Sequence, residues 1–320
     1  MTGIPIVILG GSDRRPAQLP PAGRDKHPIL GYKGVDIRVG GRRLIELLVQ
    51  RLRTCPEFDP IIVAGPARIY GGLDPSIEVV DTDSSFGGNI RAAIDAFLSR
   101  YERGPLAFTA CDILPEPREL RLQLEDFRPQ GECDLWFPMI PVRADARLGA
   151  FGWKPGYQIV PGPGEEAVRV LPGHLVIADP RALRLRFMYH LMDLAYRTRN
   201  RPIAVRRTTM AMHVIGSLLF QDLLHLLSLR VPSLTWTILR NGLGAAKKLR
   251  AGTLQRAELE DAVTKIAVKG RHRKAFPERG ARLPILDGLT LAEDIDTVEE
   301  AEEIDRAWRR GRDQAPVDRG

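Results

Sequence analysis

The sequence predicts an α/β protein built on a mostly parallel β-sheet. Short apolar runs alternate with helical patterns through the first half of the chain, and strands that alternate with helices in this way are typical of βαβ units. The 320 residues are enough for one large core, or for a main domain that carries a subdomain. The hydrophobic content of 44% is ordinary for a globular protein.

The first half of the chain supplies the predicted strands of this sheet. Each is a short apolar run, and the segments between them include apolar residues at helical spacing. The strands are predicted at residues 4–9, 60–64, 77–80 and 106–110, and the helices at residues 44–52 and 89–98. Ligands of open α/β sheets bind beyond the carboxyl ends of the strands. The loops after these strands are therefore where function is expected.

Two further strand regions follow in the middle of the chain. They are predicted at residues 134–142 and 168–178, around a Gly/Pro-rich loop at residues 154–164. Asp179, followed directly by Pro180, then predicts a helix N-terminus, with an N-cap residue and proline in the first helical position.

An all-helical insertion is predicted at residues 181–269, where aliphatic and basic residues are dense. Its helices are predicted at residues 181–199, 212–229, 234–250 and 254–268. The sheet pattern returns at residues 281–285, and a capping box that begins at Thr297 predicts a final helix. The predicted organisation is a main domain of residues 1–180 and 270–310, the helical insertion, and a disordered tail at residues 311–320.

Charge and composition argue against several function classes. The net charge of +7 arises from interleaved signs, and no aromatic-rich basic platform or zinc knuckle accompanies it, so no nucleic-acid partner is expected. The three cysteines are far apart and predict neither a metal site nor a disulfide framework. Without a signal-peptide pattern, or a run of about 18 uncharged apolar residues, a cytoplasmic protein is expected.

A carboxylate stands where the strand at residues 106–110 ends. Asp112 precedes Pro115, and a turn would account for both residues. A charge at the end of a buried strand is costly, however, unless something binds it. Asp294 and Asp296 stand just before the final helix, where helix capping is the alternative interpretation. Mg²⁺ prefers one or two carboxylates together with phosphate oxygens and water, so these three aspartates are predicted to hold Mg²⁺.

The turn after the first strand has the composition of a phosphate-binding loop. Glycines let the backbone approach a phosphate closely, and arginines supply charge-assisted hydrogen bonds. The segment matches neither GxGxxG nor the P-loop pattern, which disfavours a dinucleotide fold and a P-loop enzyme. The candidate residues here are Leu9, Gly10, Gly11, Ser12, Arg14 and Arg15.

Two other segments complete the predicted site. Lys33 precedes a short apolar stretch and the Gly40-Gly41 turn, an order that would bring an ammonium group onto phosphates held by the first loop, and Lys26 is its alternative. Gly88 and Asn89 lie in a polar loop that opens a helix. This loop is either a nucleobase-reading loop or an ordinary N-cap loop.

In their order along the chain, these segments resemble a known family. Strand-GG-x-x-R, K…VGG-R-x-L-I, a Gly-Asn loop, strand-D-x-x-P and D-I-D-T resemble the nucleotidyltransferases of the molybdenum-cofactor guanylyltransferase and sugar-phosphate or isoprenoid cytidylyltransferase type. The resemblance covers roughly residues 4–180 and 281–310. It implies a GT-A-like, Rossmann-related sheet. It also implies an enzyme that transfers a nucleoside monophosphate from an NTP to a phosphorylated acceptor, with Mg²⁺, and releases pyrophosphate.

The roles that this resemblance implies fall on residues already singled out. They are phosphate binding by Gly10, Gly11 and Arg14 or Arg15, the signature lysine at Lys33, the loop beside the base at Asn89, and metal binding by Asp112, Asp294 and Asp296. Two departures concern the lysine: Tyr32 stands where the family usually has proline, and the loop from Gly11 to Lys33 is longer than usual.

Alternatives to this function remain open. A GT-A-type glycosyltransferase would use an Asp-x-Asp motif, for which Asp81 and Asp83 are the early candidates. A degenerate, non-catalytic nucleotide-binding protein is the other alternative. The acceptor would be a phosphorylated small molecule or a lipid-linked phosphate, and His174 is the histidine to examine beside it. The apolar helix predicted at residues 212–229 indicates burial in the insertion or, alternatively, contact with a membrane surface.

Overall fold

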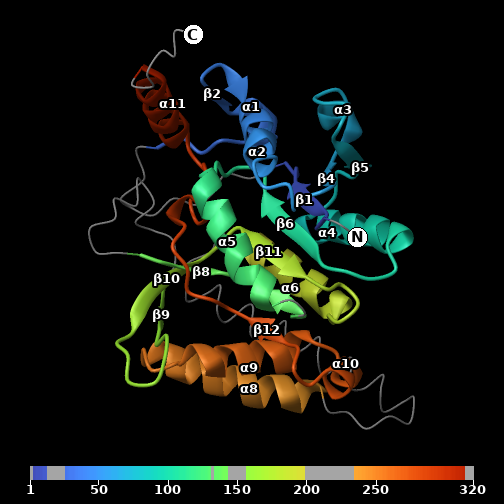
Figure 1. Cartoon of the computed structure of the whole chain (residues 1–320), viewed down its shortest axis with the longest axis vertical. Helices are drawn as coiled ribbons and strands as arrows, with labels where there is room; N and C mark the ends of the chain where they lie inside the picture. The colour runs from blue at the N-terminus through green and yellow to red at the C-terminus, as the bar shows by residue number, and fades with distance from the viewer. Residues whose placement is uncertain (1–2, 13–25, 131–132, 143–155, 199–233, 314–320) are drawn as a thin grey trace.

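A seven-stranded sheet forms the centre of the computed structural model (Figure 1). The structure describes residues 3–12, 26–130, 133–142, 156–198 and 234–313. The strand order is β12-β7-β11-β6-β1-β4-β5. The strands are β1 (Ile6–Leu9), β4 (Ile61–Gly65), β5 (Glu78–Asp81), β6 (Leu106–Ala110), β7 (Leu135–Trp136), β11 (Leu175–Ala178) and β12 (Ala281–Arg282).

All strands of this sheet run in one direction except β11, which is antiparallel to both of its neighbours. The predicted fold class, a mostly parallel α/β sheet flanked by helices, is therefore confirmed. The four parallel strands β5, β4, β1 and β6 are the four predicted from the first half of the sequence. The burial of β1, β4 and β6 explains their apolar composition, because strands that are covered on both faces have no polar side, whereas the edge strand β5 is only partly buried and carries Glu78 and Asp81.

Helices cover both faces of the sheet. On one face, α2 (Leu44–Leu52) and α5 (Pro117–Gln130) pack over Ile6, Ile8 and Trp136. On the other face, α4 (Phe86–Arg100) and α6 (Leu185–Thr198) cover a cluster that contains Val7 and Leu106. Alternate residues of β1 therefore point into two different cores, as expected for a central strand.

Smaller elements complete the two ends of the molecule. At one end, α11 (Val298–Asp313) packs on a hairpin of β2 (Arg38–Val39) and β3 (Arg42–Arg43), close to α1 (Lys33–Asp36) (Figure 1). At the other end lie α8 (Leu234–Arg250), α9 (Arg256–Ala267) and α10 (Gly270–Ala275). The remaining elements are α3 (Ala67–Tyr70), η2 (Leu289–Leu291) and a three-stranded antiparallel sheet of β8 (Met139–Pro141), β10 (Val168–Pro172) and β9 (Tyr157–Ile159).

Several predicted boundaries were wrong. Asp179 does not begin a helix: its carboxylate accepts a hydrogen bond from the Arg181 amide within a turn, and α6 begins at Leu185. The single strand predicted at residues 134–142 is divided into β7 and β8, and the strand predicted at residues 168–178 is divided into β10 and β11. Proline and glycine interrupt these apolar runs at Pro138 and Gly173, where the chain passes from one sheet to the other.

The described helices of the predicted insertion pack in two different places. Helix α6 packs on α4, whereas α8 and α9 pack on each other and on β9 and β12. The loop predicted at residues 154–164 contains β9. The helix predicted at residues 212–229 and most of the tail lie outside the described residues. None of the described helices combines the length and the apolar character that crossing a bilayer requires.

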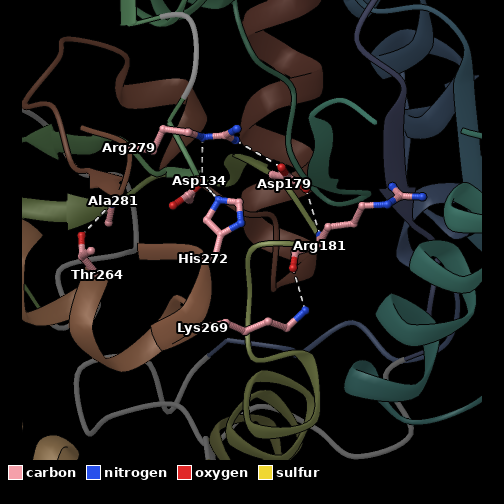
Figure 2. Close-up of polar contacts among 8 residues, drawn as sticks. All are labelled: Asp134, Asp179, Arg181, Thr264, Lys269, His272, Arg279 and Ala281. Atoms are coloured by element: carbon pink, nitrogen blue, oxygen red, sulfur yellow. Dashed lines mark hydrogen bonds and ion pairs between the residues drawn. The ribbon is translucent and has the colours of Figure 1, made fainter. Parts of the chain in front are cut away.

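A buried charge network anchors the segment that leads into β12 (Figure 2). The side chain of Asp134 is fully buried just before β7, 2.9 Å from Nε2 of His272 and 2.9 Å from Nε of Arg279. The Nη2 atom of Arg279 also lies 3.1 Å from Oδ2 of Asp179. Burial raises the pKa of Asp134, although the charges of Arg279 and His272 oppose this shift. The network joins α10 and the start of β12 to the ends of β7 and β11.

Replacing Asp134 with alanine should destabilise the fold, because the change removes one of the two carboxylates that partly buried Arg279 contacts and also the carboxylate beside His272. The expected loss in the free energy of unfolding is about 3 kcal/mol, measured by urea denaturation. The matched control is Asp261→Asn, which removes an exposed pair with Lys265 and should change stability by less than about 0.5 kcal/mol. A loss at Asp134 no larger than that of the control would contradict the anchoring role.

Candidate functional site

The carboxyl ends of four parallel strands meet at one edge of the sheet. The register pairs Leu9 of β1 with Ala64 of β4 and Ala110 of β6, and Gly65 of β4 with Asp81 of β5. The segments that follow these strands therefore gather at the same edge. Because β11 is antiparallel, its first residues also lie there, with Leu175 paired to Thr109.

Three carboxylates converge beyond the end of β6. One oxygen each from Asp112, Asp294 and Asp296 lies within 4.8 Å of the others, so the group could hold a metal ion. A backbone hydrogen bond of 2.8 Å from the amide of Ile295 to the carbonyl of Asp112 brings the two segments together. The structure thus joins the strand-end aspartate to the two aspartates before the final helix, and we call these three residues the acidic trio.

A buried ammonium group lies among these carboxylates. Lys33 is only 4% exposed, and its Nζ is 3.1 Å from Oδ2 of Asp112 and also paired with Oδ1 of Asp296. Helix α1 comes close enough for this because Gly34 has no side chain: a Cβ there would lie 3.2 Å from the Cβ of Cys111. Lys33 is therefore the signature-lysine candidate that contacts the acidic trio.

The charge balance of this cluster leaves it electronegative, since one lysine faces three carboxylates. Burial raises the pKa of Asp296 to about 6, and repulsion from Asp294 adds to this effect, while Lys33 opposes it. Dehydrated carboxylates in such proximity resist ionisation unless a cation joins them. The site is therefore suited to a cation with oxygen ligands.

Hydrogen bonds hold the segment before α11 in place. The amides of Asp296 and Thr297 donate to Oε2 of Glu300 at 2.8 and 3.0 Å, and the amide of Glu300 donates back to Oγ1 of Thr297. These bonds form the capping box predicted from the sequence. Helix capping and metal binding are thus compatible interpretations of this segment. Thr297 and Glu300 form the cap, while the carboxylates of Asp294 and Asp296 face Asp112.

The turn after β1 is closely surrounded. A Cβ at Gly10 would lie 2.8 Å from the ring of Tyr70, and a Cβ at Gly11 would lie 2.9 Å from Nδ2 of Asn89. Glycine is therefore required at both positions by close packing. Leu9 ends β1, and Ser12 is the last described residue of this turn. Arg14 and Arg15 lie outside the described residues.

The loop before α4 contacts this turn through Asn89. The Asn89 side chain is buried, and its Oδ1 accepts hydrogen bonds of 3.0 Å from Oγ1 of Thr82 and from the amide of Ser84. Ser85 caps the helix by accepting a hydrogen bond from the amide of Gly88. The oxygen of Asn89 therefore organises its own loop, while its amide nitrogen faces Gly11. The N-cap interpretation is correct, and it leaves the Asn89 amide directed towards the first loop.

Sequence reasoning missed a polar cluster beside this loop. Oη of Tyr32 lies 3.1 Å from Oδ2 of Asp83, and Nη2 of Arg68 lies 2.7 Å from Oη of Tyr32 and 3.0 Å from Oδ2 of Asp83. Arg68 and Asp83 follow the ends of β4 and β5, and Tyr32 directly precedes Lys33. These positions are the only indication in the sequence that the three residues could meet. Asp81 is engaged elsewhere, since its Oδ1 accepts a hydrogen bond from the amide of Ala67.

His174 and Lys26 lie near the final helix segment. Nε2 of His174, which directly precedes β11, lies 3.9 Å from Oδ2 of Asp294, so this histidine is close to the acidic trio. Lys26 precedes His27, whose Nδ1 lies 2.5 Å from Oε1 of Glu299 and whose carbonyl accepts a hydrogen bond from the amide of Val298. Lys33 thus contacts the acidic trio directly, while the segment that follows Lys26 packs against the start of α11.

Comparisons with known proteins support the fold. No family model matches the chain, and no curated protein matches its sequence. A hypothetical transferase from Thermus thermophilus superposes with a TM-score of 0.55 at 16% identity, over 93% of this chain and 99% of that one. CMP:2-keto-3-deoxy-manno-octonic acid synthetase complexed with CTP superposes with a TM-score of 0.50 at 10% identity, over 97% of this chain and 100% of that one. At these identities, the likeness shows a shared fold.

The raised pKa of Asp296 predicts a stability change with pH. Its pKa is 3.8 as an ordinary carboxyl and about 6 in the folded protein, so the folded state holds this proton more tightly. Stability therefore falls as pH rises through that window, by on the order of 2 kcal/mol. Asp296→Asn mimics the protonated form and should be more stable than the wild type at about pH 7.5, in urea without divalent cations.

The difference between the two proteins should disappear below about pH 3, where Asp296 is protonated in both the folded and the unfolded wild type. A variant that is less stable than the wild type at about pH 7.5, but equally stable in acid, would mean that ionised Asp296 stabilises the fold through its pair with Lys33.

Proposed function

We propose that this protein is a nucleotidyltransferase. It transfers a nucleoside monophosphate from an NTP to a phosphorylated acceptor, with Mg²⁺, and releases pyrophosphate. The observation that carries this proposal is the acidic trio with Lys33 at the same sheet edge as the Gly10-Gly11 turn. The fold shared with a synthetase that was solved with CTP supports it.

The acidic trio fits Mg²⁺ by the chemistry of its donors. Mg²⁺ takes oxygen ligands and is commonly held by one or two carboxylates, phosphate oxygens and water. Asp112, Asp294 and Asp296 supply such carboxylates, and their mutual repulsion would be relieved by a divalent cation. Bound there, Mg²⁺ would supply charge neutralisation for phosphate oxygens. Asp112 and one of the other two aspartates are the residues most directly able to hold it.

The protein's own groups would position the triphosphate. The Gly10-Gly11 turn offers a close approach to the backbone, as phosphate loops do. Lys33 would move its ammonium from the carboxylates to a phosphate oxygen, a short step because its Nζ already lies at the trio. Arg14 and Arg15 would add charge-assisted hydrogen bonds. Gly88 and Asn89 would lie on the base side, with the Asn89 amide facing Gly11.

The reaction is an in-line displacement at the α-phosphorus. An acceptor oxygen forms a bond to that phosphorus while the bond to the β-phosphate oxygen breaks, and pyrophosphate leaves with the electron pair. Positioning and charge neutralisation account for most of the rate in such transfers. A phosphate acceptor is already an anion and requires no general base. His174, beside Asp294 at the start of β11, is the candidate for contact with the acceptor.

A glycosyltransferase with a sugar nucleotide is less well supported. The two carboxylates of its Asp-x-Asp candidate make separate contacts: Asp81 accepts a hydrogen bond from the amide of Ala67, and Asp83 pairs with Arg68. Among the described residues, the acidic trio is the group whose oxygens could share a metal ion. Release of pyrophosphate, rather than a free nucleoside diphosphate, distinguishes the two reactions. A protein that binds no NTP with Mg²⁺ would correspond to the degenerate alternative.

Replacing Asp112 with asparagine should abolish turnover while the fold remains intact. The change removes a charged ligand of the proposed metal, which should lower the rate at least about a hundredfold. The measurement is pyrophosphate release in a screen of four NTPs against phosphorylated sugars, polyols and lipid-linked phosphates. Asp261→Asn, at an exposed ion pair, is the matched control. If Asp112→Asn turned over at close to the wild-type rate with unchanged Mg²⁺ dependence, the proposal that Asp112 is a metal ligand would be wrong.

Lys33, rather than Lys26, should contact the nucleotide phosphates. Lys33→Ala is expected to weaken binding of the active NTP with Mg²⁺ by roughly a hundredfold, because a buried cation that pairs with phosphate is lost. Lys26→Ala should change the same Kd by less than about threefold, since Lys26 lies next to the His27–Glu299 pair. Isothermal titration of both variants measures this, and the reverse order of effects would show that Lys26 is the phosphate-binding lysine.

A further inference from the structure

Helix α6 contacts the start of α4, next to the polar loop that the proposed function places beside the nucleotide. The two helices lie side by side on one face of the main sheet (Figure 1). Leu185, Tyr189 and Met192 of α6 join the apolar cluster formed by Ile90 and Phe97 of α4. This helix of the predicted insertion therefore lies beside the segment that the proposed function places on the base side of the site.

Asp193 makes the polar contact at this interface. Its Oδ1 accepts a hydrogen bond of 2.8 Å from the amide of Gly87, in the first turn of α4. A Cβ at Gly87 would lie 2.7 Å from the carbonyl oxygen of Tyr189 and 2.9 Å from Oδ1 of Asp193, so only glycine allows this approach. One residue earlier, Phe86 stacks on Tyr196 with ring centroids 5.6 Å apart. Residues 86 and 87 are thus held by α6 at two points.

The Asp193 carboxylate also places a negative charge at the N-terminus of α4, where it accepts a hydrogen bond from a free backbone amide. The first amides of a helix lack intrahelical partners and carry partial positive charge. Ser85 takes the amide of Gly88, and Asp193 takes the amide of Gly87. Asn89 follows directly, and its side chain links Thr82 and Ser84 to the neighbourhood of Gly11. A shift of residues 86–87 would therefore carry Asn89 away from the first loop.

We propose that Asp193 is a positioning residue for nucleotide binding. Through the Gly87 amide it fixes the first turn of α4, and so sets the position of Asn89 against the Gly10-Gly11 turn. This inference rests on the proposed function, because it takes the loop at residues 82–89 to be part of the NTP site. It assigns α6 to the nucleotide side of the reaction.

The test is the affinity for the active NTP with Mg²⁺, measured by isothermal titration. Asp193→Ala should weaken binding roughly tenfold, the size expected when a hydrogen bond to a charged group is lost. Asp193→Asn keeps an acceptor oxygen at the same place and should recover most of the affinity. Asp95→Ala, on the same α4 helix in an exposed pair with Arg91, is the control and should leave Kd unchanged.

A purely structural role of Asp193 would lower stability without moving the loop. Leu259→Ala, on α9 in an apolar cluster that includes no residue of α4, provides a destabilised protein for comparison and should retain the wild-type Kd. Amide hydrogen exchange at residues 82–90 should accelerate in Asp193→Ala and not in Leu259→Ala.

The outcomes separate this inference from the proposed function. Wild-type protein that binds none of the four NTPs would overturn both. Wild-type protein that binds an NTP, together with an Asp193→Ala variant of equal affinity and equal exchange at residues 82–90, would overturn the role of Asp193 alone.

Discussion

A single buried ammonium among three carboxylates is the interaction on which the arrangement of this edge depends. Lys33 comes from the N-terminal third of the chain, Asp112 from the end of β6, and Asp294 and Asp296 from the segment before α11. Each segment has independent backbone support, such as the hydrogen bond between Ile295 and Asp112. The fold therefore holds like charges together at a cost in stability, which is a common property of binding sites.

The contact between α11 and the β2–β3 hairpin supports this cluster. The amide of Gly40 donates a hydrogen bond of 2.6 Å to Oδ1 of Asp305, and a Cβ at Gly40 would lie 2.6 Å from Nε1 of Trp308. Gly40 and Gly41 both have positive φ, the backbone of a tight hairpin turn. The hairpin follows the helix that carries Lys33, and α11 follows Asp296. One interface thus positions the lysine and the carboxylate that it contacts.

The sequence was informative where local signals agreed with the tertiary structure. The strand β6 ends at Ala110 and leads to Asp112 as predicted, the capping box at Thr297 formed, and α2 has the predicted bounds. The order of segments also indicated which aspartates would meet. Other contacts between residues far apart in the chain had no such signal. The pairs Gly87–Asp193 and Asp134–His272 are separated by more than a hundred residues, and neither forms a motif. The prediction of a helix start at Asp179 was wrong because its carboxylate pairs with Arg279 and accepts a hydrogen bond from the amide of Arg181 within a turn.

The central claim is that the acidic trio and the Gly10-Gly11 turn bind one metal–nucleotide complex. A crystal structure with Mn²⁺ and the NTP identified by titration tests it directly, because Mn²⁺ gives an anomalous signal. We expect an anomalous peak within coordination distance of Asp112 and of Asp294 or Asp296, with the triphosphate over Gly10 and Gly11 and Lys33 turned to a phosphate oxygen. A nucleotide bound away from this edge, or a Mn²⁺ peak that none of the three aspartates contacts, would contradict it.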